Sequence, residues 1–507
     1  MPDKIFIGLN LRNHDANISY SNGKKVKYIK FEREFGIKHY GNTDYHLLEY
    51  VLNKWKIDYK KINAIAYLGD MNYPDLSSNT ANAWLDSDIL FEEHKPKNWY
   101  FEKFKCPFFR IDHHYAHHLS IWPIKKIEKT DISFVNDALG DLEDTYSVFF
   151  NNKKIKKFER EEAASFGICL NNQAHKLNVS GLWQDLAGKL MGLKSFGKID
   201  YEYCDLFKDD IKQMSSLFNE RRYYRSKTNL EKNELTRLAS CHFKAEKMIL
   251  NHFKNYADKN KKILYTGGVS QNCVLNTLLL NNFNDLYIAP HGTDDGLSLG
   301  AIEFLRQYYN EDYFDNENFP FWQDDYSPQR EPSDKTILKV AEWLAQGKIV
   351  GWYQGNGELG PRALGNRSIL MDPRVKNGKN ILNNKIKKRE WFRPFGASIL
   401  EEQVKNYFNF SGKSDYMLFL SEIKEKIKFE AITHVDNTCR IQTVDNNNIT
   451  FKKLLDSFST LTGIPMLLNT SLNINGKPIA SNIIDCFDLF KTSELDVLVI
   501  GDEIYLK

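Results

Sequence analysis

The sequence predicts an α/β protein that is built from two or three domains. Its 507 residues are more than one hydrophobic core usually accommodates. Short β-rich runs alternate with amphipathic segments over roughly the first three fifths of the chain, which is the pattern of an α/β fold. A composition of 42% hydrophobic and 13% aromatic residues is enough to fill sizeable cores. The remainder of the chain mixes short strands and helices and is expected to form an α+β unit.

The individual elements follow from the period of the apolar residues. The expected strands in the first part are 4–10, 25–31, 64–69, 131–137, 145–150, 262–268 and 285–290. The expected helices there are 43–57, 113–121, 236–258, 271–281 and 294–309. Farther along, residues 334–347 read as a helix that ends at a glycine, and a strand begins directly after it.

A stretch without helical or strand periodicity separates the two parts. Residues 308–335 are acidic, aromatic and interrupted by proline, as expected of a connection between domains. We therefore divide the chain into domains 1–320 and 321–507. No internal repeat is visible in the sequence.

Composition excludes several classes of protein. A net charge of +3 predicts no general attraction to nucleic acid. No run reaches the roughly 18 apolar residues of a membrane span, and the N-terminus lacks the apolar core of a signal peptide. The seven cysteines form no CxxC pair, which favours reduced thiols. We expect a soluble cytoplasmic protein without a membrane partner.

A dense group of cations is the strongest functional signal. Residues 355–368 read GNGELGPRALGNRS and contain Arg362 and Arg367; Lys387, Arg389 and Arg393 follow soon after. Guanidinium groups among Gly and Pro suit a clamp for a small planar or tetrahedral anion. The alternative is a solvated basic face.

A histidine-rich segment predicts a metal site. Residues 112–118 read DHHYAHH, and on a helix two histidine pairs are each one turn apart: His113 with His117, and His114 with His118. Either pair could bind one metal ion. The remaining ligands would be Asp137, which closes a strand, and Asp294, which opens a helix. Iron(II), manganese or zinc would accept such ligands.

Glycine-rich turns add a nucleotide-binding signal. Gly267 and Gly268 link a strand to a helix that starts near Asn272, so that backbone amides could contact a phosphate. Residues 291–296 repeat this design. Residues 188–193 are expected to form a third loop, which carries Lys189.

Taken together, the motifs resemble those of a known family. The order GLNLRNHDA, DHHYAH, GKLMGLKSFG, TGGVSQNCVLN, HGTDDGLSLGA, GELGPRALGNRSIL, KKREWFRPF, NTCRIQTV and LNTSLNINGKPI is similar to the O-carbamoyltransferases that act on nodulation factors, cephamycins and tobramycin. The match runs from about residue 5 to 480. The resemblance implies an actin/sugar-kinase/Hsp70-like, metal-binding ATPase domain at residues 1–320 and a YrdC-like domain at 321–507.

The resemblance also implies a reaction. Carbamoyl phosphate and ATP, with magnesium, would form carbamoyl adenylate in the C-terminal domain, and the carbamoyl group would pass to an acceptor hydroxyl at the metal site. Carbamoyl phosphate would be bound by Lys387, Arg393, Arg440 and Ser471. The nucleotide would be bound by Lys189, Gly267, Gly268, Asn272, Arg362, Arg367 and Arg389, with Asn383 as support. The metal, most readily iron(II), would be bound by His113, His117, Asp137 and Asp294.

His14, beside the first hairpin, is a candidate for activating the acceptor hydroxyl, its alternative being a hydrogen-bonded turn histidine. Asn356 and Leu359 depart from the Arg and Phe that the family usually shows, which would remove one cationic contact near the nucleotide.

The acceptor is open at this level. We favour the hydroxyl of a sugar or natural product over a hydroxymethylated pyrimidine in DNA, for which the basic aromatic runs at 96–105 and 220–227 would line the entrance. A tRNA threonylcarbamoyladenosine enzyme and a non-enzymatic nucleotide switch are rival predictions. The sequence does not indicate an oligomeric state.

Overall fold

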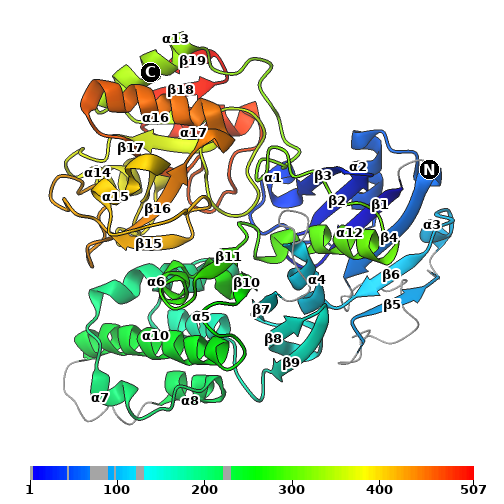
Figure 1. Ribbon diagram of the computed structural model, residues 1–507. Coiled ribbons are helices and arrows are strands. Elements are labelled where there is room, and N and C mark those ends of the chain that lie inside the picture. Colours follow the sequence, from blue (N-terminus) through cyan, green and yellow to red (C-terminus); the bar gives the residue numbers. More distant parts are fainter. Residues whose placement is uncertain (1–3, 43–44, 69–88, 96–98, 122–130, 221–229) are drawn as a thin grey trace.

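Three β-sheets and the helices between them make up the structure, a computed structural model (Figure 1). It describes residues 4–42, 45–68, 89–95, 99–121, 131–220 and 230–507. The first two sheets belong to the N-terminal three fifths of the chain, and the third belongs to the C-terminal part.

The first sheet has six strands in the order β3-β2-β1-β4-β6-β5. The bounds are β1 (Ile5–Asn10), β2 (Asn17–Asn22), β3 (Lys25–Lys30), β4 (Ile62–Leu68), β5 (Phe91–His94) and β6 (Phe108–Ile111). Strands β1, β2 and β3 form an antiparallel meander, and β4 and β6 continue parallel to β1. The first hairpin, beside which the sequence places His14, is formed by β1 and β2. Short helices α1 (Phe31–Phe35), α2 (His46–Trp55) and α3 (Trp99–Glu102) belong to this half.

The second sheet repeats this path. Its order is β11-β10-β7-β8-β9, with β7 (Ile132–Asn136), β8 (Asp144–Phe150), β9 (Lys153–Glu159), β10 (Lys262–Thr266) and β11 (Asp285–Ile288). Again an antiparallel meander is followed by two strands parallel to its first strand. The sequence showed no repeat because a topology depends on apolar pattern and pairing and does not require identical residues.

Two helices lie between these sheets. They are α4 (His113–Ser120) and α12 (Leu297–Tyr308), which pack on each other, and α12 also packs on β1, β2 and β4 (Figure 1). The approach is close enough to require glycine: a Cβ on Gly300 would lie 2.0 Å from the carbonyl oxygen of Ala116. This packing brings the N-terminus of each helix to the same point.

A helical layer covers the second sheet. It consists of α5 (Phe166–Lys176), α6 (Trp183–Leu193), α7 (Tyr201–Cys204), α8 (Met214–Asn219), α10 (Leu230–Lys254) and α11 (Cys273–Leu280). The expectation of a loop at 188–193 is wrong, because these residues are the last turns of α6. Leu186 and Leu190 are buried one turn apart, and this helical period outweighs the two glycines.

The third sheet has eight strands in the order β15-β16-β14-β17-β13-β12-β18-β19. They are β12 (Val350–Tyr353), β13 (Arg367–Met371), β14 (Gly396–Leu400), β15 (Phe419–Glu422), β16 (Thr438–Val444), β17 (Met466–Ser471), β18 (Val497–Ile500) and β19 (Glu503–Leu506). The α-helices of this part are α13 (Asp334–Ala345), α14 (Gly378–Ile381), α15 (Val404–Tyr407), α16 (Ile449–Thr462) and α17 (Ile483–Thr492), of which α13 and α16 pack together.

The C-terminal part contacts the first sheet and helix α1. In the irregular connection, Gln323 forms isolated bridges with Tyr28 and with Gly357. The buried guanidinium of Arg33 donates to the carbonyl oxygens of Glu358 and Gly360 at 2.6 and 2.7 Å. These contacts hold the C-terminal part against the edge where the helices of the N-terminal part begin.

The two segments considered for polynucleotide binding fall partly outside the described residues. Residues 96–98 of the first run and 221–227 of the second are not described. Across the described ranges, no helix is long and apolar enough to cross a membrane.

Candidate active site

A cavity of about 460 Å³ lies between the N-terminal sheets and the C-terminal part. One region of its wall carries His14, Asp137 and Asp294. Another carries most of the predicted cations together with a serine: Arg362, Lys387, Arg389, Arg393, Arg440 and Ser471. Gly268, Asn272 and Lys189 also line it. Residues that are far apart in the sequence therefore line one cavity.

Four of the predicted metal ligands converge at one end of this cavity. The Nε2 atoms of His113 and His117 lie 3.0 and 3.3 Å from Oδ2 of Asp137. The same nitrogens lie 3.6 and 3.4 Å from Oδ1 of Asp294. Ligands that are each about 2.1 Å from one ion are separated by about 3.0 to 3.4 Å, so the four atoms fit a shared metal ion.

Electrostatics agree with that fit. All four side chains are buried. Despite their burial, the hydrogen bonds of Asp137 to both imidazoles hold its pKa well below the ordinary value. Burial opposes the charge of His117, but the two carboxylates raise its pKa to about 9. Concentrated negative charge of this kind is what a divalent cation would neutralise.

The second histidine pair faces elsewhere. Nδ1 of His114 lies 2.7 Å from the hydroxyl of Ser147, and Nε2 of His118 lies 3.1 Å from the amide oxygen of Asn152. The ring of His118 also stacks on Phe149 at 4.7 Å. Both histidines are thus turned toward β8 and the turn that follows it, away from the carboxylates.

Local sequence explains how the ligands are held. Asp112 caps α4, because its carboxylate accepts from the backbone N–H of Tyr115 at 2.7 Å. The backbone N–H of Gly268 donates to Oδ1 of Asp137 at 3.0 Å. A Cβ on Gly267, whose φ is +90°, would lie 2.2 Å from the carbonyl oxygen of Asn136. The Gly-Gly turn therefore orients a predicted metal ligand, and Gly267 does not line the cavity.

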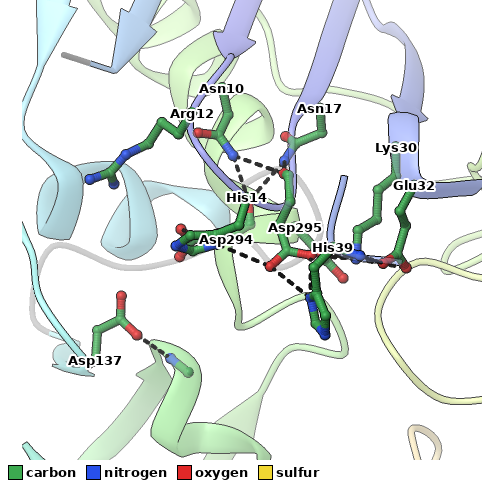
Figure 2. Close-up of polar contacts among 12 residues, drawn as sticks. Asn10, Arg12, His14, Asn17, Lys30, Glu32, His39, Asp137, Asp294 and Asp295 are labelled. Carbon is green, nitrogen blue, oxygen red and sulfur yellow. Dashed lines mark hydrogen bonds and ion pairs between the residues drawn. The ribbon is translucent and has the colours of Figure 1, made fainter. Parts of the chain in front are cut away.

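The backbone of the other aspartate, Asp294, is held by the first hairpin (Figure 2). The amides of Asn10 and Asn17 donate to the backbone carbonyl of Asp294 at 3.2 and 2.9 Å. The same two amides donate to the carbonyl of Asp15 at 3.1 and 2.7 Å. The motifs GLNLRNHDA and HGTDDG are joined by these bonds although they lie at opposite ends of the N-terminal part.

His14 borders the metal cluster. Its Nδ1 lies 3.2 Å from Oδ2 of Asp15 and 3.7 Å from Oδ2 of Asp294. Burial disfavours the imidazolium, but the bond to Asp15 and the charge of Asp294 raise the pKa of His14. A histidine bonded to a carboxylate through Nδ1 has Nε2 available for a ligand in the cavity.

A buried charge network next to His14 was missed in the sequence (Figure 2). The ammonium of Lys30 lies 3.1 Å from Asp15, 3.0 Å from Glu32 and 2.6 Å from Asp295. Nδ1 of His39 lies 3.0 Å from Asp15. Asp15, Glu32 and His39 could offer metal ligands, but the Lys30 ammonium already supplies the positive charge there. Their sequence spacing carries no recognisable signal because the strands of a meander bring them together.

At the opposite end, cations gather with few counter-ions. The ammonium of Lys387 contacts Ser471 and Asn473, with its Nζ 2.7 Å from the Ser471 carbonyl oxygen. Arg389 bonds Asn383 at 2.7 Å and lies over the ring of Phe395. The Nε atoms of Arg362 and Arg440 are buried without a hydrogen-bond partner among the described residues.

Neighbouring cations in this group lower each other's pKa. Burial, together with Arg440 and Arg393, lowers the pKa of Arg362 to about 9. Burial and the guanidinium groups of Arg389 and Arg393 hold the pKa of Lys387 well below its usual value. An anion in the cavity would relieve both the repulsion and the lost hydration, which is the physical signature of an anion site.

Arg367 is a correction to the predicted nucleotide set. It is fully buried outside the cavity lining, where its Nη2 lies 2.8 Å from Asp325 and donates to two backbone carbonyls, while its Nη1 donates to two more. Its guanidinium also stacks on Tyr353 at 3.6 Å. With both terminal nitrogens engaged by the fold, Arg367 has a structural role that the motif alone did not reveal.

Lys189 reaches the cavity but is paired. Its Nζ lies 2.5 Å from Oε1 of Glu390 and 2.5 Å from the carbonyl oxygen of Ser180. The ion pair joins α6 to the C-terminal part. Asn356 and Leu359, the two departures from the family pattern, do not line the cavity, and Leu359 is a buried core residue. The expected loss of a cationic contact there has no counterpart in this geometry.

Comparisons with known proteins agree with the motifs. The model of the carbamoyltransferase N-terminus matches residues 101–302, and that of the carbamoyltransferase C-terminus matches residues 341–507. Among solved structures, HypF of T. kodakarensis is 13% identical with a TM-score of 0.40, covering 61% of this chain and 48% of that one.

Curated relatives extend over most of the chain. The nodulation protein NolNO of Sinorhizobium fredii is 28% identical over 97% of this chain and 79% of its own length. NolO of Bradyrhizobium diazoefficiens is 37% identical over 47% and 48%. The 3'-hydroxymethylcephem-O-carbamoyltransferase of Amycolatopsis lactamdurans is 30% identical over 63% and 64%. The chain thus spans about half to four fifths of the length of these relatives. With both family models matched in order, the chain belongs to the carbamoyltransferase family of transferases.

Proposed function

We propose that the protein is an ATP-dependent O-carbamoyltransferase. The observation that carries this proposal is one cavity that has an anion clamp at one end and, at the other, the two carboxylates of a cluster of two His and two Asp. We assign the cluster to an actin/sugar-kinase/Hsp70-like domain at residues 1–320 and the clamp to a YrdC-like domain at 321–507. The repeated meander-plus-parallel-strand topology of the first two sheets supports the first assignment.

The reaction would proceed in three steps. Water cleaves carbamoyl phosphate to carbamate and phosphate. A carbamate oxygen then attacks the α-phosphorus of ATP, and pyrophosphate leaves, which gives carbamoyl adenylate. Finally the acceptor oxygen attacks the carbamoyl carbon, the acceptor proton is lost and AMP leaves. Carbamate is short-lived in water, so holding it in the cavity between the first two steps would limit its breakdown.

The cations would act on the phosphate-bearing groups. Lys387, Arg393, Arg440 and Ser471 would hold carbamoyl phosphate, while Arg362 and Arg389 would contact the nucleotide phosphates. Their buried positive charge stabilises negative charge that develops during phosphoryl and acyl transfer. Because the Nε of Arg362 has no hydrogen-bond partner among the described residues, an anion could accept a hydrogen bond from this atom without displacing one of them.

The metal would be held by His113, His117, Asp137 and Asp294. When bound, iron(II) or a similar divalent ion would polarise the carbamoyl oxygen and favour attack on its carbon. His14 lies beside this cluster with Asp15 on its Nδ1, so its Nε2 would accept the proton of the incoming hydroxyl. Gly268 and the two hairpin asparagines would keep the carboxylates oriented.

We propose a small-molecule hydroxyl, of a sugar or a natural product, as the acceptor. The cephem relative carries an O-carbamoyltransferase name, which supports this class.

The test needs no acceptor. The purified protein is incubated with carbamoyl phosphate, ATP, magnesium and iron(II) or manganese, and pyrophosphate and carbamoyl adenylate are measured. We expect pyrophosphate release that depends on carbamoyl phosphate and is lost in Arg393→Ala. The matched control is Lys388→Ala, which removes an exposed cation from the same segment. Release that requires threonine and bicarbonate instead would assign the protein to the tRNA-modifying class.

A further inference from the structure

The loop that carries Arg362 is irregular. It spans residues 354–366 and joins β12 to β13. Pro361, Arg362 and Ala363 are the residues by which this loop lines the cavity. Because the loop lies between two strands and belongs to neither, the direction of the Arg362 side chain depends on the individual bonds that hold the neighbouring backbone.

Glu358 holds the half of the loop that follows Arg362. Its side chain is fully buried, and its Oε1 accepts hydrogen bonds from the backbone N–H groups of Leu364, Asn366 and Arg367 at 2.8, 2.9 and 3.0 Å. Since Glu358 precedes Arg362 and its three partners follow it, the carboxylate closes the loop around Arg362. This half is fixed from within the C-terminal part.

Arg33 of helix α1 holds the half that precedes Arg362. Its Nη1 donates to the carbonyl oxygen of Glu358 at 2.6 Å, and its Nη2 donates to that of Gly360 at 2.7 Å. A planar guanidinium can form two such bonds at once in a fixed direction. Pro361 comes next and its ring restricts φ, so a fixed carbonyl at Gly360 sets the path of the backbone into Arg362.

The same loop lies directly on the N-terminal part. A Cβ on Gly360, whose φ is +83°, would be 2.2 Å from the carbonyl oxygen of Pro290, in the turn that leads to Asp294. The backbone N–H of Leu359 donates to the carbonyl oxygen of Pro320 at 2.8 Å. The loop is therefore an interface between the two parts, where a small shift would displace the cation that it carries.

A guanidinium at the position of Arg33 is costly to bury. Its side chain is only 2% exposed, and its Nε has no hydrogen-bond partner among the described residues. The facing carboxylate is Asp325, since a Cβ on Gly357 would lie 2.3 Å from its Oδ2 and 3.3 Å from Nη1 of Arg33. Asp325 is already paired with Arg367 at 2.8 Å. An apolar side chain would pack here without this desolvation cost, so the carbonyl bonds account for an arginine at this position.

Helix α1 connects the loop to the other end of the cavity (Figure 2). Glu32, the residue before Arg33, lines the cavity. Its carboxylate lies 3.0 Å from the ammonium of Lys30 and accepts from the backbone N–H of His39 at 2.8 Å. One short helix thus carries a member of the buried charge network and the side chain that holds the loop. The position of Arg33 is fixed by the first of these.

We propose that Arg33 is a positioning residue for the anion clamp and that it acts through Arg362. By holding the carbonyls of Glu358 and Gly360, it keeps the guanidinium of Arg362 directed toward the phosphates of the nucleotide. Arg33 itself does not line the cavity. The proposal rests on the proposed function, in which Arg362 contacts these phosphates, and it adds a residue of the N-terminal part to the clamp.

A double-mutant cycle tests whether Arg33 acts through Arg362. Carbamoyl-phosphate-dependent pyrophosphate release is measured for the wild type, Arg33→Met, Arg362→Met and the double variant. Arg33→Met keeps an apolar side chain and removes both carbonyl bonds, so KM for ATP should rise about tenfold while kcat falls less than about threefold. In the Arg362→Met background the same change should raise KM by less than about twofold. If the two effects multiply, Arg33 acts independently of Arg362 and the proposal is wrong.

Two further variants separate positioning from general stability. Trp55→Phe removes the 2.7 Å bond from the indole Nε1 to Asp324, which joins α2 to the irregular connection, and it should leave KM for ATP unchanged. Arg33→Lys keeps the buried charge but loses the fork, so it should raise KM even if Arg33→Met does not fold. An equal rise in Trp55→Phe, or a wild-type KM in Arg33→Lys, would overturn the proposal.

Direct binding separates failure of this proposal from failure of the proposed reaction. ATP affinity is measured by titration calorimetry without carbamoyl phosphate. The positioning role stands and the reaction is wrong if the wild type binds ATP without releasing pyrophosphate, and if Arg33→Met weakens binding about tenfold only while Arg362 is present. If the wild type does not bind ATP, or if Arg33→Met binds it equally tightly, Arg33 does not position the clamp.

Discussion

The side-chain amide of Asn17 donates to the backbone carbonyl of Asp294 at 2.9 Å, across 277 residues of sequence. The backbone N–H of Ser298 donates to the amide oxygen of Asn17 at 3.2 Å, which fixes the orientation of the amide. Through this pair, a strand of the first sheet holds the start of a helix that carries a candidate metal ligand. The hairpin is therefore part of the site although it contributes no ligand.

Removing this bond should weaken metal binding. Asn17→Ala leaves the carbonyl of Asp294 without one of its two amide donors, so the carboxylate is less firmly oriented. Groups that orient ligands typically contribute about 10- to 100-fold to metal affinity. We expect a loss of at least tenfold in Mn²⁺ affinity by titration calorimetry. Ser21→Ala, in the same strand, is the control, and an equal loss there would point to general destabilisation.

Only one histidine pair should hold metal. His113→Ala should lose bound iron(II) or manganese and the acyl-transfer step, while pyrophosphate release persists. His118→Gln should retain its metal, since His118 faces Asn152 and Phe149. Metal content is measured by plasma mass spectrometry after dialysis. If His113→Ala keeps its bound metal and His118→Gln loses it, the assignment of the metal-binding histidine pair is reversed.

Arg440 should cost stability in the absence of an anion. Burial and the charge of Arg393 lower the pKa of its guanidinium, and its Nε has no hydrogen-bond partner within the described part of the chain. Arg440→Met keeps much of the apolar volume and removes the charge, so the unliganded protein should gain about 1 kcal/mol. The increase in Tm that phosphate gives the wild type should vanish. Lys388→Met, at an exposed position, should change neither quantity; a lower Tm for Arg440→Met would contradict the prediction.

His39 should make stability depend on pH. Burial opposes its charge, but its bonds to Asp15 and Asp185 raise its pKa from 6.5 to about 9. Because the folded-state pKa is above the unfolded value, the stabilisation is complete below about pH 6.5 and is lost as the pH rises through 9. Its size is at most about 3 kcal/mol. Urea unfolding should show His39→Gln to be less stable than the wild type at pH 6 and to converge with it near pH 10.

The matched control for this pH effect is His46→Gln. The side chain of His46 is exposed on α2. The difference in the free energy of unfolding between pH 6 and pH 10 should be the same for His46→Gln as for the wild type. If the free energies of unfolding of wild type and His39→Gln differ by the same amount across this pH range, His39 is uncharged in the folded protein.

Much of the fold could be predicted from local pattern. Alternating and continuous apolar runs located strands such as β1, β7 and β10, because the side-chain period of two and the burial of one or both faces leave a direct trace in sequence. The same reasoning failed at residues 188–193, where glycines were read as a loop. Helix α6 is maintained there by packing on α5, which no local window contains.

The sequence by itself determined where particular residue types are concentrated, namely in the DHHYAHH helix, the Gly-Gly turn and the arginine-rich motifs. Only tertiary structure decided how they are used. His113 and His117 meet the carboxylates because α4 packs against α12 with one face toward β8, and this placed the other pair away from the cavity. Arg367 and Arg362 are five residues apart in one motif, yet one is bonded inside the C-terminal part and the other lines the cavity. The charge of a side chain determines what it can bind, whereas long-range packing determines which groups it contacts.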